Sequence, residues 1–258
     1  MTTMTASSPI TTDAIAAYRT ATDNHPTATL VRNAVTAAEL QDVALNRNVV
    51  TSSDFSFSTK LDQWDVTNQK SSGRCWMFAA LNLFRVGAME KMNLSEFEFS
   101  QNYTFFWDKF ERANWFLSQI IETADLPLDD RTVGFMLDYP LDDGGQWNML
   151  VNVVEKHGLV PKAVMPESIA SSKSAPMNGQ LKHRLRAAAF ELRSMHIRGA
   201  SADELDATRH DIMGEIWRML SIHLGTPPTE FDWQWNDKDN EFHRDGEMTP
   251  QEFAAKYV

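Results

Sequence analysis

The sequence contains a single cysteine, Cys75, and no apolar run near the roughly 18 residues that a membrane-spanning helix needs. One cysteine excludes an internal disulfide and fits a reducing compartment. The first residues, MTTMTASSPITTDA, lack the basic start and the apolar core of a secretory signal peptide. We therefore expect a cytoplasmic protein that has no membrane partner.

Basic residues are also scarce, since 24 Lys and Arg face 35 Asp and Glu and the formal net charge is −11. Such a charge repels phosphate backbones and argues against nucleic acid as a partner. With 258 residues, 43% of them hydrophobic, the chain is long enough for one large or two small domains. Composition therefore predicts a soluble globular protein.

The first fifty residues give weak structural signals. A short helix is expected around Thr12–Thr20, and the stretch TAAELQDVALNRN predicts a capped helix in which Thr36 is the N-cap and Glu39 completes a capping box. From Thr51 to Lys70, Phe and Trp alternate with polar residues, which favours an extended or irregular segment.

The remainder of the chain reads as helices followed by a hairpin. Leu126–Gly145 is rich in Pro, Asp and Gly and is expected to be a loop. Glu230–Met248 alternates with period two around the turn residues DKDN and predicts a β-hairpin. Apolar spacing predicts helices over Cys75–Met92, Ser100–Ala124, Trp147–His157, Gly179–Arg198 and Ala202–Leu224.

The chemistry concentrates in QKSSGRCWMFAA, where a polar loop delivers Cys75 to the first turn of an apolar helix. Unpaired backbone N–H groups and the positive end of the helix dipole stabilise a thiolate there. A structural cysteine is the alternative, but it would more often sit inside a helix. Gln69 lies six residues earlier, so its amide and the Cys75 N–H could form an oxyanion hole. On spacing alone a glutamine in a polar loop is usually just solvated.

Resemblance to a known family supports the catalytic interpretation. Gln-x5-Cys-Trp-x-Phe-Ala resembles the signature of papain-like cysteine peptidases, and NQKSSGRCWMFAALN resembles the bleomycin hydrolase/aminopeptidase C family. The likeness continues through LDQWDVTNQK, DDGGQWNMLVNVVEKHGLVPKAVMPES and FDWQWNDKDNEFHRDGEMTPQEFAAKYV, and so covers most of residues 52–258.

The resemblance implies an α+β papain-like cysteine proteinase fold. This chain would supply mainly its helical left domain, with helical insertions and a short β-hairpin near the C-terminus. We expect an N-terminal extension and leading helix in residues 1–50, the helical catalytic subdomain in 51–170, and a helical insertion with the hairpin in 171–258. The C-terminal β-domain of the family is expected to be absent.

The resemblance also assigns roles to residues. Cys75 would be the nucleophile and Gln69 the oxyanion donor, while Gly144, Gly145 and Trp76 would bind the substrate. No metal and no organic cofactor is implied. The partners would be peptide substrates and further copies of the chain, because members of the family form hexamers.

The family also requires a His general base and an Asn that orients it. Papain-like spacing would place the base at His210 or His223, but both fall in the predicted helix Ala202–Leu224, so we expect them to lie far from Cys75. His157 and His243 are interpreted as structural. No Asn-Ser-Trp-like string occurs, and we expect the chain to stop before the base.

Two functions remain open at this point. The first is a cysteine aminopeptidase that removes N-terminal residues from peptides through a thioester on Cys75. The alternative is a catalytically inactive fragment that acts as a binding or assembly module, which the missing base would favour. The intact Gln69/Cys75 pair favours the enzyme.

Overall fold

The structure is a computed structural model and describes residues 9–54, 56, 58 and 65–258. The chain divides into two units, one that ends at residue 61 and one that begins at residue 62. None of the described side chains of the first unit is buried, so the core and the candidate site belong to the second. The predicted division at residues 50 and 170 stays a prediction.

The first unit consists of short helices. They are α1 (Thr12–Asp23), α2 (Ala28–Ala37), α3 (Leu40–Ala44) and α4 (Arg47–Ser52). The predicted helix around Thr12 is confirmed, with Thr11 as its N-cap. The capping box at Thr36 is wrong, because Thr36 lies near the end of α2 and its hydroxyl donates to the Arg32 carbonyl at 2.7 Å. A threonine hydroxyl can bond back within a helix as readily as it can cap the next one.

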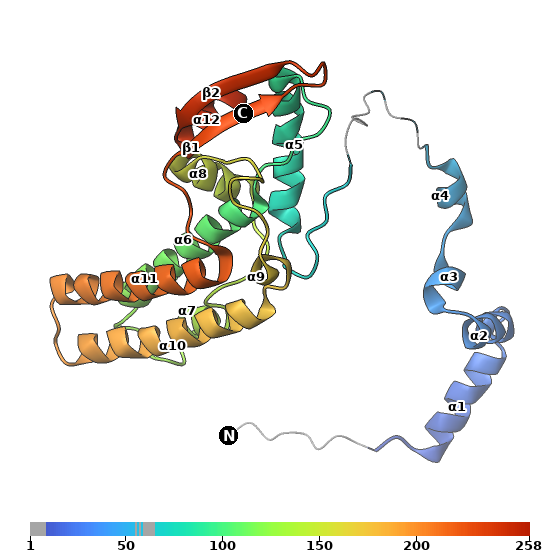
Figure 1. Ribbon diagram of the computed structural model, residues 1–258. Coiled ribbons are helices and arrows are strands. Elements are labelled where there is room, and N and C mark those ends of the chain that lie inside the picture. Colours follow the sequence, from blue (N-terminus) through green and yellow to red (C-terminus); the bar gives the residue numbers. More distant parts are fainter. Residues whose placement is uncertain (1–8, 55, 57, 59–64) are drawn as a thin grey trace. The chain divides into compact units, whose positions relative to one another are not determined.

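The second unit is mostly helical (Figure 1). Its elements are α5 (Cys75–Met92), α6 (Gln101–Glu122), α7 (Arg131–Asp138), α8 (Trp147–His157), α9 (Ile169–Ser172), α10 (Ala175–Ile197), α11 (Ala202–Leu224), β1 (Phe231–Asn236), β2 (Phe242–Met248) and α12 (Pro250–Tyr257). The predicted bounds of α5, α8 and α11 match those observed.

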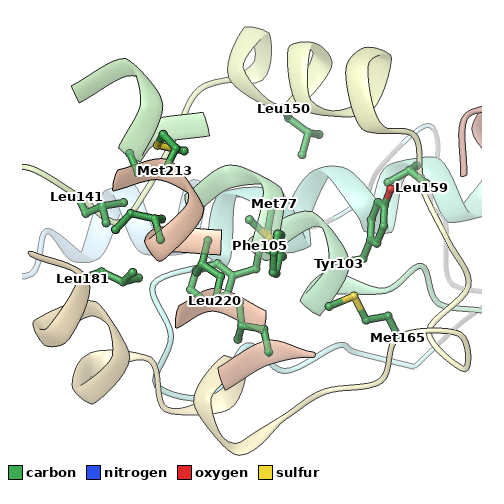
Figure 2. Packing of buried hydrophobic residues seen from close by; sticks show 14 of the residues in the cluster. Met77, Tyr103, Phe105, Leu141, Leu150, Leu159, Met165, Leu181, Met213 and Leu220 are labelled. Atoms are coloured by element: carbon green, nitrogen blue, oxygen red, sulfur yellow. The ribbon is translucent and has the colours of Figure 1, made fainter. Parts of the chain in front are cut away.

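Helix α6 is the centre of this unit and packs against α5, α8, α10 and α11. Ser100 caps it by accepting a hydrogen bond from the Tyr103 N–H. Aromatic side chains of α6 are buried, with Phe106 completely inaccessible to solvent. Figure 2 shows Met77 of α5, Phe105 of α6 and Leu220 of α11 within the same cluster. Burying an aromatic or aliphatic side chain of this size stabilises a fold by about 1.5–3 kcal/mol.

The predicted hairpin is confirmed as the antiparallel pair β1 and β2. A bulge after Trp233 shifts the register, and Gly246 with φ 82° lies opposite. The Trp235 indole N–H donates to the Met92 carbonyl at 2.9 Å and so ties the hairpin to the end of α5.

Three elements depart from the sequence-based expectations. The segment Leu126–Gly145 is not all loop, because Asp130 caps α7 and Val133 and Met136 of that helix are buried. Helix α10 begins four residues before the predicted Gly179, with a proline in its first turn. Helix α12 was not predicted, although Thr249 and Glu252 form a complete capping box at its start.

The predicted irregular approach to Cys75 is only partly described. Its first residues, Thr51 and Ser52, belong to α4, and residues 65–70 contain neither helix nor strand. Its aromatic residues Phe55, Phe57 and Trp64 lie outside the described residues. No helix in the described part of the chain combines the length and apolarity needed to cross a membrane.

We expect Gly158→Ala to lower the free energy of unfolding by about 3 kcal/mol. Gly158 closes α8 at φ 73° and ψ −161°, a region that only glycine adopts readily. An added Cβ would also lie 2.2 Å from the carbonyl carbon of Pro250. Urea unfolding followed by circular dichroism measures the loss.

Gly199→Ala is the matched control for this substitution. Gly199 has φ 85°, and an added Cβ would meet no described atom within 4 Å. It should therefore cost only the backbone strain, about 1 kcal/mol. Equal losses in the two variants would show that the contact with Pro250 does not decide the effect.

Candidate active site

Cys75 is the first residue of α5 and is exposed to solvent. The helix begins there because Arg74, the N-cap residue, leaves helical geometry while its carbonyl accepts the Phe78 N–H at 3.0 Å. The first N–H groups of the helix are therefore unpaired around the cysteine. The prediction that Cys75 opens a helix is confirmed, and the alternative of a buried structural cysteine is wrong.

Gln69 precedes Cys75 in a tight loop. Lys70 adopts φ 56°, and the Ser72 hydroxyl donates to the Gln69 carbonyl at 2.6 Å. The Gln69 Oε1 atom is buried and has no partner among the described residues. No hydrogen bond from its Nε2 to a described acceptor is present either.

The loop before Cys75 interlocks with the segment that contains the glycine pair. Gly73 has φ 63°, and a Cβ at this position would lie 2.5 Å from Cγ of Asp143. The Gly144 N–H points at the Gly73 carbonyl, with an N···O distance of 3.4 Å. Only glycine at position 73 allows the two segments to approach this closely.

Gly145 lies directly against the indole of Trp76, the residue after the cysteine. A Cβ at Gly145 would be 2.8 Å from the ring. Beside this contact is a groove of about 270 Å³. Its lining consists of Trp76, Ala79, Ala80, Leu83, Gly145, Gln146, Trp147 and Leu150. The structure thus brings Trp76 and Gly145 together at one groove, whose lining includes none of Cys75, Gln69 and Gly144.

Charged residues of α6 form hydrogen bonds to the loop that contains the glycine pair. Lys109 donates to the Asp142 carbonyl at 2.9 Å and to Oδ1 of Asp143 at 3.1 Å, and Arg112 donates to the Gly144 carbonyl. Asp108 accepts from Arg112 at 2.7 Å. Burial raises the pKa of Asp108 and lowers the pKa of Lys109, and the opposite charges around each group counteract these shifts.

Arg74 fixes the loop to a different part of the chain. Its side chain is 1% exposed and forms two hydrogen bonds to Glu167, at 2.8 and 2.7 Å. Its Nε donates to the Ser72 hydroxyl at 2.8 Å. Burial raises the pKa of Glu167, but the hydrogen bonds and charge of Arg74, with a hydrogen bond from Ser171, outweigh it and leave the pKa below the ordinary 4.5.

The histidines do not complete a catalytic dyad within the described residues. His210 lies 3.5 Å from Asp206, and His223 pairs with Gln180 at 3.2 Å; no hydrogen bond from either ring to Cys75 is present in the described part of the chain. Spacing alone therefore does not identify the base.

The two histidines interpreted as structural have partners within the fold. His157 stacks on Trp107 and hydrogen-bonds to Glu111 at 2.7 Å, and His243 bonds to Asp237 at 3.0 Å. The His157 ring is thus bonded within the helical core, and the His243 ring is bonded to the turn of the hairpin.

The model of the Peptidase C1-like family matches residues 9–258. The chain belongs to this family. Aminopeptidase C of Streptococcus thermophilus is 46% identical over 228 residues, which are 88% of this chain and 51% of that protein. Bleomycin hydrolase of Homo sapiens is 42% identical over 256 residues, which are 98% of this chain and 56% of that protein.

A crystal structure of PepW from Lactobacillus rhamnosis HN001 (DR20) matches with a TM-score of 0.91 and 44% sequence identity. The match covers 98% of this chain and 57% of that one. The predicted α+β papain-like fold is therefore confirmed, in a form that is mainly helical with one short hairpin. The chain spans about half the length of these Peptidase C1-like relatives.

Sequence reasoning overlooked the charged residues that support this Peptidase C1-like site. Arg74 stands within the cysteine motif but received no role, and Lys109 and Glu167 were not singled out. One signal existed for Lys109, since a lysine among the apolar residues of a core helix needs a partner. Glu167 gives no such local signal.

We expect Glu167→Gln to lower the free energy of unfolding at pH 7 by about 3 kcal/mol, because it leaves the buried Arg74 cation without its counter-charge. The folded-state pKa of Glu167 is depressed, so its stabilisation is present above about pH 4.5 and is lost as the pH falls further. The variant should therefore lose less stability than the wild type between pH 7 and the acid range.

Glu215→Gln provides the control for this measurement. Glu215 pairs with Arg184 at 2.6 Å, but its side chain is 45% exposed, so the loss should stay below about 1 kcal/mol. Urea titrations at a series of pH values measure both variants. If the free energy of unfolding of Glu167→Gln fell with pH as it does in the wild type, the ion pair of Arg74 and Glu167 would not be the cause of the acid dependence.

Proposed function

We propose that the chain provides the nucleophile and the oxyanion hole of a cysteine aminopeptidase that hydrolyses N-terminal residues from peptides. The observation that carries the proposal is the exposed Cys75 at the first turn of α5. Gln69 precedes it, and the side-chain oxygen of Gln69 has no hydrogen-bond partner among the described residues. Membership of the Peptidase C1-like family supports it. So do the names of the relatives, aminopeptidase C and bleomycin hydrolase.

In this proposal the Cys75 thiolate attacks the carbonyl carbon of the first peptide bond. The negative charge that develops on the carbonyl oxygen is stabilised by the Cys75 backbone N–H and by Nε2 of Gln69. Collapse of the tetrahedral intermediate breaks the C–N bond, and the shortened peptide leaves as an amine after protonation. Water then hydrolyses the thioester and releases the amino acid.

Proton transfer requires a general base and acid in addition to these groups. In the family this group is a histidine oriented by an asparagine. The described residues provide no imidazole hydrogen-bonded to Cys75, so the proposal assigns the base to none of the histidines of this chain.

Gly144, Gly145 and Trp76 are the proposed substrate-binding residues. The Gly144 N–H and carbonyl already bond to Gly73 and Arg112, so the backbone of Gly145, which packs against the Trp76 indole, is the part of the glycine pair proposed to bond to a peptide. Peptides are the proposed substrates, and the chemistry as proposed uses neither a metal nor an organic cofactor. A cytoplasmic location and homo-oligomeric assembly, a hexamer in the family, are part of the same proposal.

We expect Gln69→Ala to slow the acylation of Cys75 by an amino-acid p-nitrophenyl ester on the order of 10²-fold. Alkylation of Cys75 by iodoacetamide should keep its rate, since displacement at a tetrahedral carbon forms no oxyanion. The activated ester needs no protonation of its leaving group, so the assay does not depend on the base. Stopped-flow release of nitrophenolate and mass spectrometry of the thioester measure the reaction.

Gln119→Ala is the matched control, because the Gln119 side chain bonds only to Glu122 among the described residues. Cys75→Ala should abolish both reactions. If Gln69→Ala slows acylation and alkylation equally, Gln69 positions the thiol and is no oxyanion donor. A wild-type chain that is never acylated would favour the alternative, an inactive binding or assembly module.

The alkylation rate tests how Cys75 is activated. The helix N-terminus alone should make the thiol about two to five times as reactive towards iodoacetamide at neutral pH as a free thiol. With the amino-acid p-nitrophenyl ester, the purified chain should accumulate the thioester. It should show no measurable aminopeptidase turnover of peptides, because no described imidazole is hydrogen-bonded to Cys75. A rate profile that inflects below about pH 6 would reveal an imidazolium partner and contradict this expectation.

A further inference from the structure

Lys109 is the most deeply buried lysine of the candidate site. Its side chain is 1% exposed, and its ammonium lies 5.2 Å from the centre of the Phe105 ring. Its two hydrogen bonds to described residues go to successive residues of one loop, the Asp142 carbonyl and the Asp143 carboxylate. Because a buried ammonium is costly without acceptors, these two contacts determine where the loop can lie.

Asp143 connects this buried cation to the loop that carries the nucleophile. One of its oxygens accepts from Lys109 at 3.1 Å and from Asn178 at 3.4 Å. The same carboxyl group occupies the space where a Cβ of Gly73 would be, two residues before Cys75. A shift of the Asp143 side chain would therefore change the contact between the two loops.

The glycine pair follows Asp143 directly. The Gly144 N–H faces the Gly73 carbonyl, and the Gly144 carbonyl accepts from Arg112, one turn after Lys109 on α6. The position of the turn is thus set by two cations on one face of α6. The turn has no helix or strand geometry of its own to define it.

We propose that Lys109, acting through Asp143, is a positioning residue that holds the Gly144–Gly145 turn in register with Cys75. A peptide backbone bound along the turn would then present its carbonyl carbon to the thiol. This role rests on the proposed function, because it requires that a peptide binds at the glycine pair. Lys109 touches neither the substrate nor the reacting atoms.

The test compares a reagent that uses the turn with one that does not. A dipeptidyl chloromethyl ketone offers a peptide backbone and alkylates Cys75 with saturation, whereas iodoacetamide reacts without such binding. We expect Lys109→Met to raise the half-saturation concentration of the dipeptidyl reagent about tenfold and to leave the iodoacetamide rate within twofold of wild type. Hydrogen exchange of the amides in residues 142–146 should become faster.

Asp143→Asn covers the case in which Lys109→Met fails to fold. The side chain of Asp143 is 49% exposed, and asparagine keeps an acceptor oxygen of the same size. We expect a smaller rise in the half-saturation concentration, about threefold, and little further effect when it is combined with Lys109→Met. Lys156→Met is the control, because Lys156 forms an ion pair with Glu111 at 2.7 Å and contacts neither loop among the described residues.

The positioning role alone would be overturned if the wild type and both variants showed the same half-saturation concentration with the dipeptidyl reagent. Unchanged exchange in residues 142–146 of the variants would overturn it as well. A wild-type chain that shows no saturation with the dipeptidyl reagent would contradict peptide binding at the turn and overturn this inference. The proposed function fails separately, if the amino-acid p-nitrophenyl ester never acylates Cys75.

Discussion

The position of Cys75 depends on a buried cation, Arg74, which directly precedes it. A guanidinium stays charged at any accessible pH, so its burial is tolerated only while its hydrogen bonds are complete. Both carboxylate oxygens of Glu167 accept hydrogen bonds from Arg74. The centres of the Phe78 and Phe105 rings lie 4.9 and 5.3 Å from the central carbon of the guanidinium. Because a buried ion pair often adds little net stability, we interpret its role as fixing one arrangement of the loop.

A second constraint acts on the opposite side of the loop, where Gly73 and Asp143 meet. The first constraint holds the Cys75 loop to the segment before α9, and the second holds it to the glycine pair. Both constraints connect the loop to the same core helix, α6, the first through Phe105 and the second through Lys109. The loop therefore has little freedom, although it contains no regular structure, and this rigidity is what an oxyanion hole requires.

Sequence reasoning succeeded where the signal is local. Apolar periodicity predicted the bounds of α11, and a loop-to-helix transition predicted the place of Cys75. It failed at Thr36, where the first unit buries no described side chain that could enforce the capping pattern. The ion pairs of the site join residues 34 and 93 positions apart, and no local pattern records which distant carboxylate a cation will meet.

The candidate site separates two parts of cysteine peptidase chemistry that act together in peptide hydrolysis. The proposed nucleophile and oxyanion donors need fixed positions, and buried charges and close glycine contacts fix the loop that leads from Gln69 to Cys75. A general base contributes about 10²–10⁴-fold, whereas one oxyanion donor contributes about 10²–10³-fold, so neither dominates. The leaving group decides which is indispensable: a nitrophenolate departs without a proton, but an amine must be protonated. Under the proposed function, the second unit therefore supplies the groups that acylation needs, and hydrolysis of a peptide bond needs an imidazole in addition.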